Sequence, residues 1–350
     1  MEFSETYSFF SERLIAWYGA NKRDLPWREH SEPYNVWLSE IILQQTRVAQ
    51  GLPYYKRMLE AFPTVKHLAD ADEETVMKLW QGLGYYSRAK NLHATAKIIA
   101  CQHRGSFPET YDELITLKGI GDYTASAIAS ICFDEARAVV DGNVFRVLAR
   151  VFGIDVPINT TEGTARFKQL AELLLDKAQP GTYNQALMEF GALQCKPQSP
   201  DCEQCVMNDK CSALAENKIE LLPVKLKKNS IRKRYFNYAV LIDNQGNTIL
   251  RKRVEKDIWQ GLYEPPLCET ARTGSLKDVK NWLDQRNIRY QSIDKFYHKP
   301  LIHKLSHQHL QCQFWIVHTP DTIAGSIDKE HLKKYPMPVV IANFWNEFGG

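Results

Sequence analysis

Apolar residues recur every three or four positions through most of the first 222 residues, which is the spacing of one face of an α-helix. No internal repeat is visible in this part of the sequence. The pattern predicts helices over residues 3–18, 36–46, 65–80, 89–100, 111–116, 144–151, 164–177 and 183–193. We therefore expect an all-α N-terminal domain at residues 1–222.

A change of pattern marks a second domain. Residues 225–234 contain six Lys or Arg and no acid, which is typical of a solvated connector near phosphates or of an ordinary soluble linker. From residue 235 the apolar residues alternate, as they do along strands. The sequence predicts a β-hairpin at 235–242 and 248–252, a helix at 276–282 and a strand at 310–317. We expect a linker at 223–234 and an α+β domain at 235–350.

Length and composition narrow the class of protein. At 350 residues the chain can form two domains that each bury a core, and its net charge of +3 is only weakly basic. This charge permits a polyanionic partner without requiring one, because a dedicated nucleic-acid binder usually has a pI above about 9. The sequence shows neither a signal-peptide pattern nor an apolar span of about 18 residues. We expect a cytoplasmic protein with no membrane segment.

Four cysteines lie in one short segment, residues 195–211. Cys195, Cys202, Cys205 and Cys211 are separated by six, two and five residues, so the loop brings their thiols together. Zinc sites usually pair two short arms across a longer spacer, whereas a compact run of four thiolates suits an iron–sulfur cluster. Zinc and disulfides stay as alternatives. A cluster needs reduced thiolates, which indicates a reducing, intracellular compartment.

One carboxylate lies on an apolar helical stripe. Glu40 comes three residues after Trp37 and one before Ile41, so it points toward the apolar side of its helix. Burial would raise the pKa of this carboxyl and favour a role as proton donor. The alternative is a glutamate at the edge of the stripe that forms an ion pair with an arginine.

Two glycine-containing turns connect helices. Residues 82–88 carry two glycines and two tyrosines, whose flat rings suit stacking on a base or packing in the core. Gly119 and Gly121 allow a tight turn, and the helix that follows offers its free N–H groups to an anion such as phosphate. An ordinary helix–helix connection is the alternative for both turns.

Asp141 directly precedes a predicted helix. A carboxylate at this position caps the helix and is favoured by its dipole. Capping alone would explain the residue.

Taken together, these motifs resemble the adenine DNA glycosylases (MutY family) of the endonuclease III, or helix-hairpin-helix, superfamily. The resemblance covers about residues 1–220 and depends on segments that occur in the family's order. They are residues 25–28, 37–46, 82–86, 119–121 and 140–144 together with the four cysteines. It implies a helix-hairpin-helix glycosylase domain that carries one 4Fe-4S cluster.

The resemblance also implies roles for individual residues. Glu40 matches the acid that protonates the departing adenine, and Asp141 matches the carboxylate that stabilises the sugar cation. Tyr123 occupies the position where endonuclease III has its lysine nucleophile, which indicates hydrolysis without lyase chemistry. Asn143 is expected to position Asp141 or a water. The resemblance assigns contacts with DNA to Arg28, Gln45, Thr46, Leu83, Tyr85, Gly119 and Gly121.

The C-terminal domain resembles the Nudix-like domain that recognises 8-oxoguanine in the same family. The match is carried by residues 251–253 and 259–265. No Nudix box follows, so the domain is expected to bind without hydrolysing a pyrophosphate. The family's Phe-Ser-His loop reads Leu305-Ser306-His307 here, which leaves Ser306 and His307 as DNA-binding candidates.

We therefore expect a monomeric glycosylase that acts on duplex DNA with adenine opposite 8-oxoguanine or guanine. Protein partners are left open by the sequence. A bifunctional glycosylase/lyase for oxidised pyrimidines that uses a lysine such as Lys118 is the main rival. A non-catalytic DNA sensor and a nucleotide hydrolase are less consistent, because Glu40 and Asp141 occur together and the Nudix box is absent.

Overall fold

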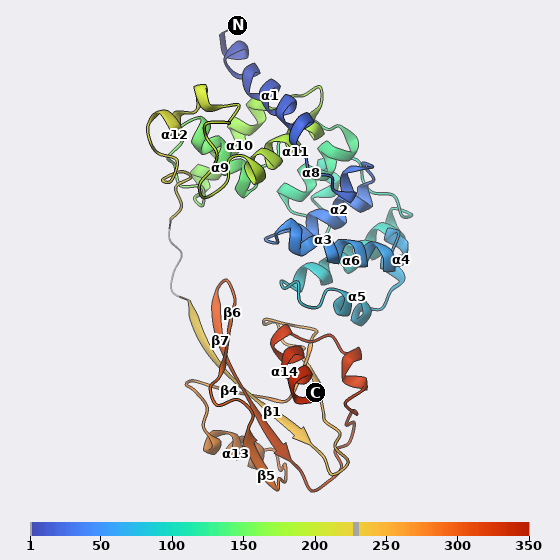
Figure 1. Cartoon of the computed structure of the whole chain (residues 1–350). Helices are drawn as coiled ribbons and strands as arrows, with labels where there is room; N and C mark the ends of the chain where they lie inside the picture. The colour runs from blue at the N-terminus through green and yellow to red at the C-terminus, as the bar shows by residue number, and fades with distance from the viewer. Residues whose placement is uncertain (1, 227–230, 350) are drawn as a thin grey trace. The chain divides into compact units, whose positions relative to one another are not determined.

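The computed structural model describes residues 2–226 and 231–349 (Figure 1). Residues 227–230, in the middle of the predicted linker, lie outside this description. The chain divides into two compact units, one of residues 1–70 and 91–227 and the other of residues 71–90 and 228–350. Within the described ranges, no helix has the length and apolar character needed to cross a membrane.

The N-terminal part is helical, as predicted. Its helices are α1 (Glu2–Asn21), η1 (Pro26–Arg28), α2 (Pro33–Leu43), α3 (Val48–Ala61), α4 (Val65–Asp70), α5 (Glu73–Leu79), α6 (Ser87–Gln102), α7 (Tyr111–Leu114), α8 (Asp122–Phe133), α9 (Gly142–Val151), α10 (Thr161–Leu174), α11 (Pro180–Leu193), η2 (Asn208–Lys210) and α12 (Ser212–Ala215). This arrangement of helices is the fold class expected for the first domain.

Most predicted helices end within about three residues of the observed limits, and two of the differences have a clear local cause. The helix predicted over 65–80 is two helices, because Asp72 accepts a hydrogen bond from the Thr75 N–H (2.8 Å) and starts a new one. The helix predicted to reach residue 46 ends at Leu43, since Gln45 has a φ of 54°, outside the helical range. After this turn α3 begins, which the sequence analysis did not predict.

The core of the first unit forms around α11, which packs against α1, α8 and α9. Phe190 of α11 lies edge-on to Trp17 of α1, with ring centroids 5.0 Å apart. Gly191 lets α11 approach α9, because a Cβ atom there would lie 2.6 Å from the Cβ of Asn143. This close packing fixes the start of α9 against the end of α11.

A mixed sheet organises the second unit, in the strand order β4-β1-β7-β5, with β6 also paired to β7. The central strands β1 (Arg232–Ile242) and β7 (Gln308–His318) run parallel to each other. The antiparallel neighbours are β4 (Leu267–Thr270), β5 (Ser292–Lys295) and β6 (Leu301–Lys304). The remaining elements are β2 (Arg251–Lys252), β3 (Tyr263–Glu264), α13 (Leu276–Asp284), η3 (His331–Lys334) and α14 (Val339–Gly349).

The predicted hairpin of 235–242 with 248–252 is wrong in its pairing. β1 pairs with β4 and β7, and the returning segment meets it only in one bridge between Ile242 and Thr248. Burial favours this pairing, because β1 is buried almost throughout its apolar half and β7 covers one edge of it along all eleven residues, while β4 covers four residues of the other edge. The predicted helix at 276–282 and strand at 310–317 are confirmed.

Helices cover both faces of this sheet. Ala239 and Trp315 pack with Val279 of α13 on one face. On the other face Phe314 stacks against Phe344 of α14, with centroids 4.1 Å apart. The alternation along β1 and β7 therefore produces two apolar layers, as expected for an α+β domain. Residues 71–90 join this unit, where Glu74 accepts hydrogen bonds from Lys252 (2.8 Å) and Tyr263 (2.5 Å).

Candidate active site

Three helices of the first unit bring four predicted residues together. Glu40 lies near the end of α2, Tyr123 in the first turn of α8, and Asp141 and Asn143 at the start of α9. Each of the four is partly buried and keeps some accessible surface. The packing of α2 against α8 includes a hydrogen bond from Gln44 to the Thr124 hydroxyl (3.3 Å). The group therefore stands on rigid elements at the edge of the core.

Glu40 is held in a state close to the balance between its two protonation forms. Burial raises the pKa of its carboxyl to about 7, and the negative charge of Asp141 adds to the rise. A hydrogen bond with Tyr123 and the charge of Arg28 act in the opposite direction. A carboxyl with this pKa can donate a proton and take one back near neutral pH.

Tyr123 touches Glu40 and the core at the same time. Its hydroxyl lies 3.2 Å from the Met188 sulfur and also forms a hydrogen bond with Glu40. A phenol has one hydrogen to donate and can accept another. When Glu40 is protonated, Tyr123 can accept its O–H and donate to sulfur, and when Glu40 is ionised, Tyr123 can donate to the carboxylate. The tyrosine thus has a hydrogen bond available in both states.

Asp141 caps α9 and is the more strongly bound of the two acids. Its oxygens accept from the backbone N–H groups of Asn143 and Val144 and from the Asn143 side chain, each at 2.8 Å. Burial raises the pKa of Asp141, and these hydrogen bonds oppose that rise by favouring the ionised form. The N-terminus of α9 also favours negative charge. Asp141 is therefore a fixed anion with its oxygens oriented.

A second layer of polar contacts holds Asn143. Its side-chain oxygen accepts from Arg146 (2.9 Å). The same guanidinium donates to the backbone oxygens of Gly191 (2.6 Å) and Cys195 (2.7 Å). Asp141 is thus connected through Asn143 and Arg146 to the first residue of the cysteine loop. Sequence reasoning did not select Arg146.

Arg28, a predicted DNA contact, is engaged inside the protein. Its guanidinium donates to both oxygens of Glu189 (3.0 and 2.9 Å), and Arg23 also binds this carboxylate (2.8 and 2.6 Å). Burial alone would raise the pKa of Glu189, but these bonds outweigh it and lower the pKa to about 2. Among the described residues no ion pair joins Glu40 to an arginine. The contact of Arg28 with DNA stays a prediction.

The four cysteine thiols of the loop lie close enough to influence one another's ionisation. Burial raises the pKa of the Cys205 thiol to about 11, and the charges of the other three cysteines, Cys195, Cys202 and Cys211, add to the rise. A hydrogen bond from the Met207 N–H opposes it. The described part of the chain contains no three His, Cys, Asp or Glu side chains already arranged around a single metal ion.

The chemistry around these thiols still suits a cluster of iron and sulfide. Arg150, buried in the core, donates to the Cys195 sulfur (3.5 Å), and the Met207 N–H donates to the Cys205 sulfur (3.4 Å). Arg150 also binds the backbone oxygens of Lys196 (2.7 Å) and Pro197 (3.1 Å). Positive charge and N–H donors favour thiolates, which are the form that binds iron.

The turn with Gly119 and Gly121 has the geometry of a tight hairpin before α8. Gly119 has a φ of +79°, and an added Cβ would lie 2.5 Å from Asn91, so a side chain is excluded there. Both glycines are exposed, which leaves the N-terminus of α8 accessible. Asp122 at this end is paired with Lys168 (2.8 Å). A phosphate contact at the hairpin stays a prediction.

The other predicted DNA contacts differ in exposure. Gln45 is exposed on its turn, and Thr46 beside it is partly buried. In the second unit, the side chain of Tyr85 is 45% exposed, whereas that of Leu83 is only 5% exposed. Tyr85 and Gln45 are therefore available to a ligand as they stand, and Leu83 would have to move.

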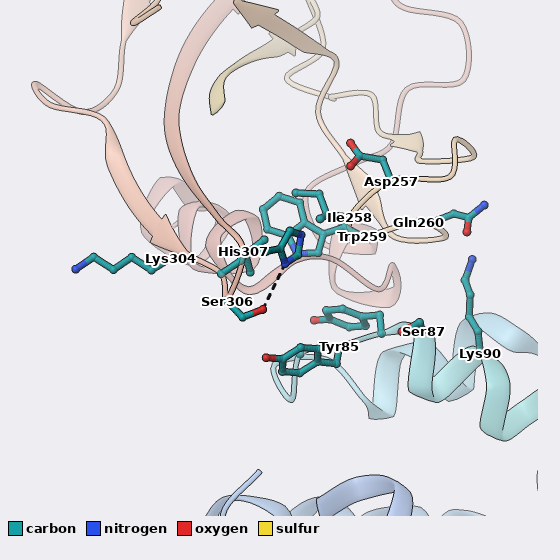
Figure 2. A pocket seen from close by; sticks show the side chains of 13 residues that line it. Tyr85, Ser87, Lys90, Asp257, Ile258, Trp259, Gln260, Lys304, Ser306 and His307 are labelled. Carbon is teal, nitrogen blue, oxygen red and sulfur yellow. Dashed lines mark hydrogen bonds between the residues drawn. The ribbon is translucent and has the colours of Figure 1, made fainter. Parts of the chain in front are cut away.

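A cavity of about 330 Å³ lies in the second unit (Figure 2). It is lined by Ser306 and His307, which the sequence predicted as DNA contacts, and by Trp259 and Asp257, which the sequence did not predict as contacts. Tyr85 lines the same cavity. The ring nitrogen Nδ1 of His307 lies 3.3 Å from the Ser306 hydroxyl. Aromatic faces with a few polar groups are the composition of a site for a flat heterocycle.

Comparison with known proteins points to one family. Residues 38–172 match the HhH-GPD superfamily of base excision DNA repair proteins, and residues 237–347 match the NUDIX domain. The chain is 36% identical over 299 residues to the adenine DNA glycosylase of Buchnera aphidicola subsp. Schizaphis graminum (strain Sg), covering 84% of each chain. It is 45% identical over 213 residues to the human adenine DNA glycosylase, covering 58% of this chain and 39% of the human protein.

Solved structures show the same helical fold. A thermostable thymine-DNA glycosylase superimposes with a TM-score of 0.56 and 26% identity, covering 61% of this chain and 98% of that one. Endonuclease III in a non-covalent DNA complex gives a TM-score of 0.53 at 20% identity, covering 61% of this chain and 97% of its own.

Proposed function

We propose, since the chain belongs to the adenine DNA glycosylase family, that this base excision repair enzyme removes adenine opposite 8-oxoguanine or guanine in duplex DNA. The observation that carries the proposal is the pair of unlike carboxyls. Glu40 has a pKa raised to about 7, and Asp141 is oriented by three hydrogen bonds beside it. Cleavage of an N-glycosidic bond requires an acid at the base and an anion at the sugar.

In the first step the protonated Glu40 gives its proton to a ring nitrogen of adenine. The bond between C1′ and the base then breaks, its electron pair leaves with the neutral adenine, and positive charge develops on the sugar. Asp141 stabilises that charge without needing to move, because its oxygens are already fixed by Asn143 and the start of α9. This division of labour resembles that of paired carboxylates in glycosidases.

In the second step water adds to C1′ and completes the hydrolysis. Glu40, now ionised, accepts the proton that the water loses and is thereby restored. Tyr123 supports both forms of Glu40 through its hydroxyl. By resemblance to the family it would line the sugar's side of the pocket. Because Tyr123 is not a nucleophile of the lysine type, no Schiff base with the sugar is formed at this position.

Adenine in a duplex is stacked, so the enzyme must extrude it before the reaction. Extrusion costs a few kcal/mol, which contacts with the DNA have to offset. Gln45, which is exposed at a turn with positive φ, suits insertion beside the vacated stack. The amide groups at Gly119 and Gly121 suit a backbone phosphate.

The cysteine loop would hold one 4Fe-4S cluster through Cys195, Cys202, Cys205 and Cys211. When bound, the cluster would stabilise the loop through metal–thiolate bonds, and the proposed hydrolysis needs only the side chains of Glu40, Asp141 and Tyr123. Arg13 anchors the same loop through hydrogen bonds to Asp209 (2.5 Å) and the Val206 oxygen (2.9 Å). Measured iron and sulfide at four each per chain would support this assignment, and one zinc per chain would contradict it.

The cavity of Ser306 and His307 is proposed to receive the 8-oxoguanine. Trp259 and Tyr85 line this cavity and provide apolar faces. They supply aromatic surface that the loop itself lacks, because Leu305 stands where the family loop has an aromatic residue. The 8-oxo base differs from guanine by a carbonyl at C8 and a hydrogen at N7, and both can form hydrogen bonds with a serine and a histidine.

An excision assay tests the proposal. Three duplexes carry adenine opposite 8-oxoguanine, adenine opposite guanine, or an oxidised pyrimidine. We expect adenine release from the first two, faster from the first, and no release from the third. Borohydride should trap no covalent complex. Release of the oxidised pyrimidine with efficient trapping would identify the lyase rival and contradict the proposal.

A further inference from the structure

The loop that contains Ser306 and His307 is followed by Gln308, whose buried side-chain amide has two polar neighbours. Gln308, the first residue of β7, is 4% exposed. Its side-chain nitrogen lies 3.0 Å from Nε2 of His307, and its oxygen lies 3.5 Å from Nη1 of Arg234. The amide therefore stands between a guanidinium and an imidazole.

The guanidinium decides which way the amide faces. Arg234 is buried and donates to Asp257 (2.9 and 2.8 Å) and to Glu269 (2.7 Å twice), so it is a fixed cation. A guanidinium has hydrogens on every nitrogen and accepts nothing. Only the oxygen of Gln308 can face it favourably, which turns the Gln308 NH₂ group toward His307.

The direction of the amide then fixes the ring. An NH₂ group is a donor, so Nε2 of His307 must accept, and the neutral imidazole carries its hydrogen on Nδ1. That hydrogen points at the Ser306 hydroxyl, the bond drawn as a dashed line in Figure 2. Ser306 accepts from His307 and keeps its own hydrogen for another partner. Among the described residues, no other hydrogen bond of the Ser306 side chain is found.

We propose that Gln308, oriented by Arg234, is a positioning residue that fixes His307 in the Nδ1–H tautomer and so presents the Ser306 hydroxyl to the cavity as a donor. The opposite tautomer would consume the Ser306 hydrogen and present only an acceptor. The ligand favoured by the cavity is a flat base that offers a carbonyl oxygen. This oxygen is the one at C8 of 8-oxoguanine, which guanine lacks, and that identification rests on the proposed function.

Substitution of Gln308 by glutamate should reverse the direction of the two hydrogen bonds that link residue 308, His307 and Ser306. A carboxylate still pairs with Arg234, but it accepts from His307, which moves the ring hydrogen to Nε2 and turns the Ser306 hydrogen toward Nδ1. Gln311→Glu is the matched control, because Gln311 lies on β7 three residues away, so its side chain points to the opposite face of the sheet. Both variants add the same charge to the same strand.

The tautomer is read by NMR on the full chain with isotope-labelled histidine, the His307 signals being assigned by their loss in His307→Asn. We expect Nδ1–H in the wild type and in Gln311→Glu, and Nε2–H in Gln308→Glu. Nε2–H in the wild type would overturn the proposal. This readout needs no DNA and is independent of the proposed function.

The consequence for recognition is measured by binding to duplexes in which the target adenosine carries a 2′-fluorine that suppresses release of the base. Wild-type preference for 8-oxoguanine over guanine is established first, and its absence would refute the proposed specificity alone. Given that preference, we expect Gln308→Glu to reduce it about tenfold, the value of one hydrogen bond, and Gln311→Glu to leave it unchanged. Equal losses in both variants, or a changed tautomer with unchanged preference, would overturn the role of Ser306.

The same samples are used to check that the variants are correctly folded. Adenine release from the duplex with guanine should stay within about threefold of the wild-type rate in both variants, because the residues proposed for the chemistry lie in the other unit. If adenine release from the duplex with guanine is also lost in Gln308→Glu, Gln308→Met is tested in its place. This variant removes the donor to His307 without adding charge. We expect Gln308→Met to lower the preference for 8-oxoguanine while the basal rate is kept, and an unaltered preference would overturn the proposal.

Discussion

Two glutamates in the first unit show how the same side chain acquires opposite properties. Glu40 on α2 and Glu189 on α11 both lie on the apolar side of a helix, and both feel the charge of Arg28. Burial acts on each in the same direction. Yet the pKa of Glu40 rises to about 7, while that of Glu189 falls to about 2.

The difference comes from direct hydrogen bonds. Glu189 accepts from two guanidinium groups, whereas Glu40 has the hydroxyl of Tyr123 and only the more distant field of Arg28. By occupying Arg28, Glu189 keeps Glu40 from becoming an ion pair. A structural salt bridge thus preserves the acid that the proposed reaction needs.

The largest effect is expected from Glu40→Gln. This change removes the transferable proton and keeps the shape of the side chain, so single-turnover release of adenine should fall by about 10³-fold or more. Binding of the mismatched duplex should be nearly unchanged. A variant that excises at close to the normal rate would exclude Glu40 as the acid.

Glu189→Gln should affect stability first. It leaves Arg23 and Arg28 without their carboxylate, which we expect to lower the free energy of unfolding by about 3 kcal/mol. Chemical denaturation measures this change. If the variant stays folded, Arg28 acts more strongly on Glu40, lowers its pKa and shifts the alkaline limb of the rate profile to lower pH. An unshifted limb would show that Glu189 does not control Glu40.

The rate of adenine release should depend on pH. The reaction needs protonated Glu40, so the single-turnover rate should be highest below pH 7 and fall about tenfold per unit above it. At the acid end it should fall again as Asp141, whose pKa is also raised, takes up a proton. A profile that is flat from pH 6 to 9 would contradict the assigned acid.

A smaller effect is expected from Gly191→Ala. The added methyl would lie 2.6 Å from Asn143 and push the start of α9 away, which disturbs the support of Asp141. We expect about a tenfold lower rate of excision. Gly19→Ala on α1 is the control, since no atom lies within 4 Å of the added methyl. Equal rates in the two variants would show that the contact is unimportant.

Local patterns in the sequence predict where helices and strands occur better than they predict which strands pair. Most of the helices, the division into an all-α and an α+β domain, and the position of Glu40 on an apolar stripe follow from spacing alone, whereas α3 was not predicted. The pairing of β1 with β7 does not, because the two strands are separated by more than 60 residues and the nearer segment at 248–252 appeared to fit. Pairing over such distances leaves no local signal.

The candidate site shows the same limit. Glu189 comes three residues after Ala186 and one before Phe190, which is the spacing that selected Glu40. Arg146 comes one residue before Val147 but three after the polar Asn143, so the same spacing does not select it. Only the fold shows that Glu189 meets two arginines and that Arg146 reaches Asn143 and Gly191.

The most direct test is titration of the Glu40 carboxyl itself, by infrared difference spectra between the wild-type protein and Glu40→Gln from pH 4 to 9. The account predicts that the carboxylate band assigned to Glu40 appears with a midpoint near pH 7. A midpoint near 4.5, the ordinary value for a glutamate, would mean that Glu40 is ionised at neutral pH and cannot be the proton donor.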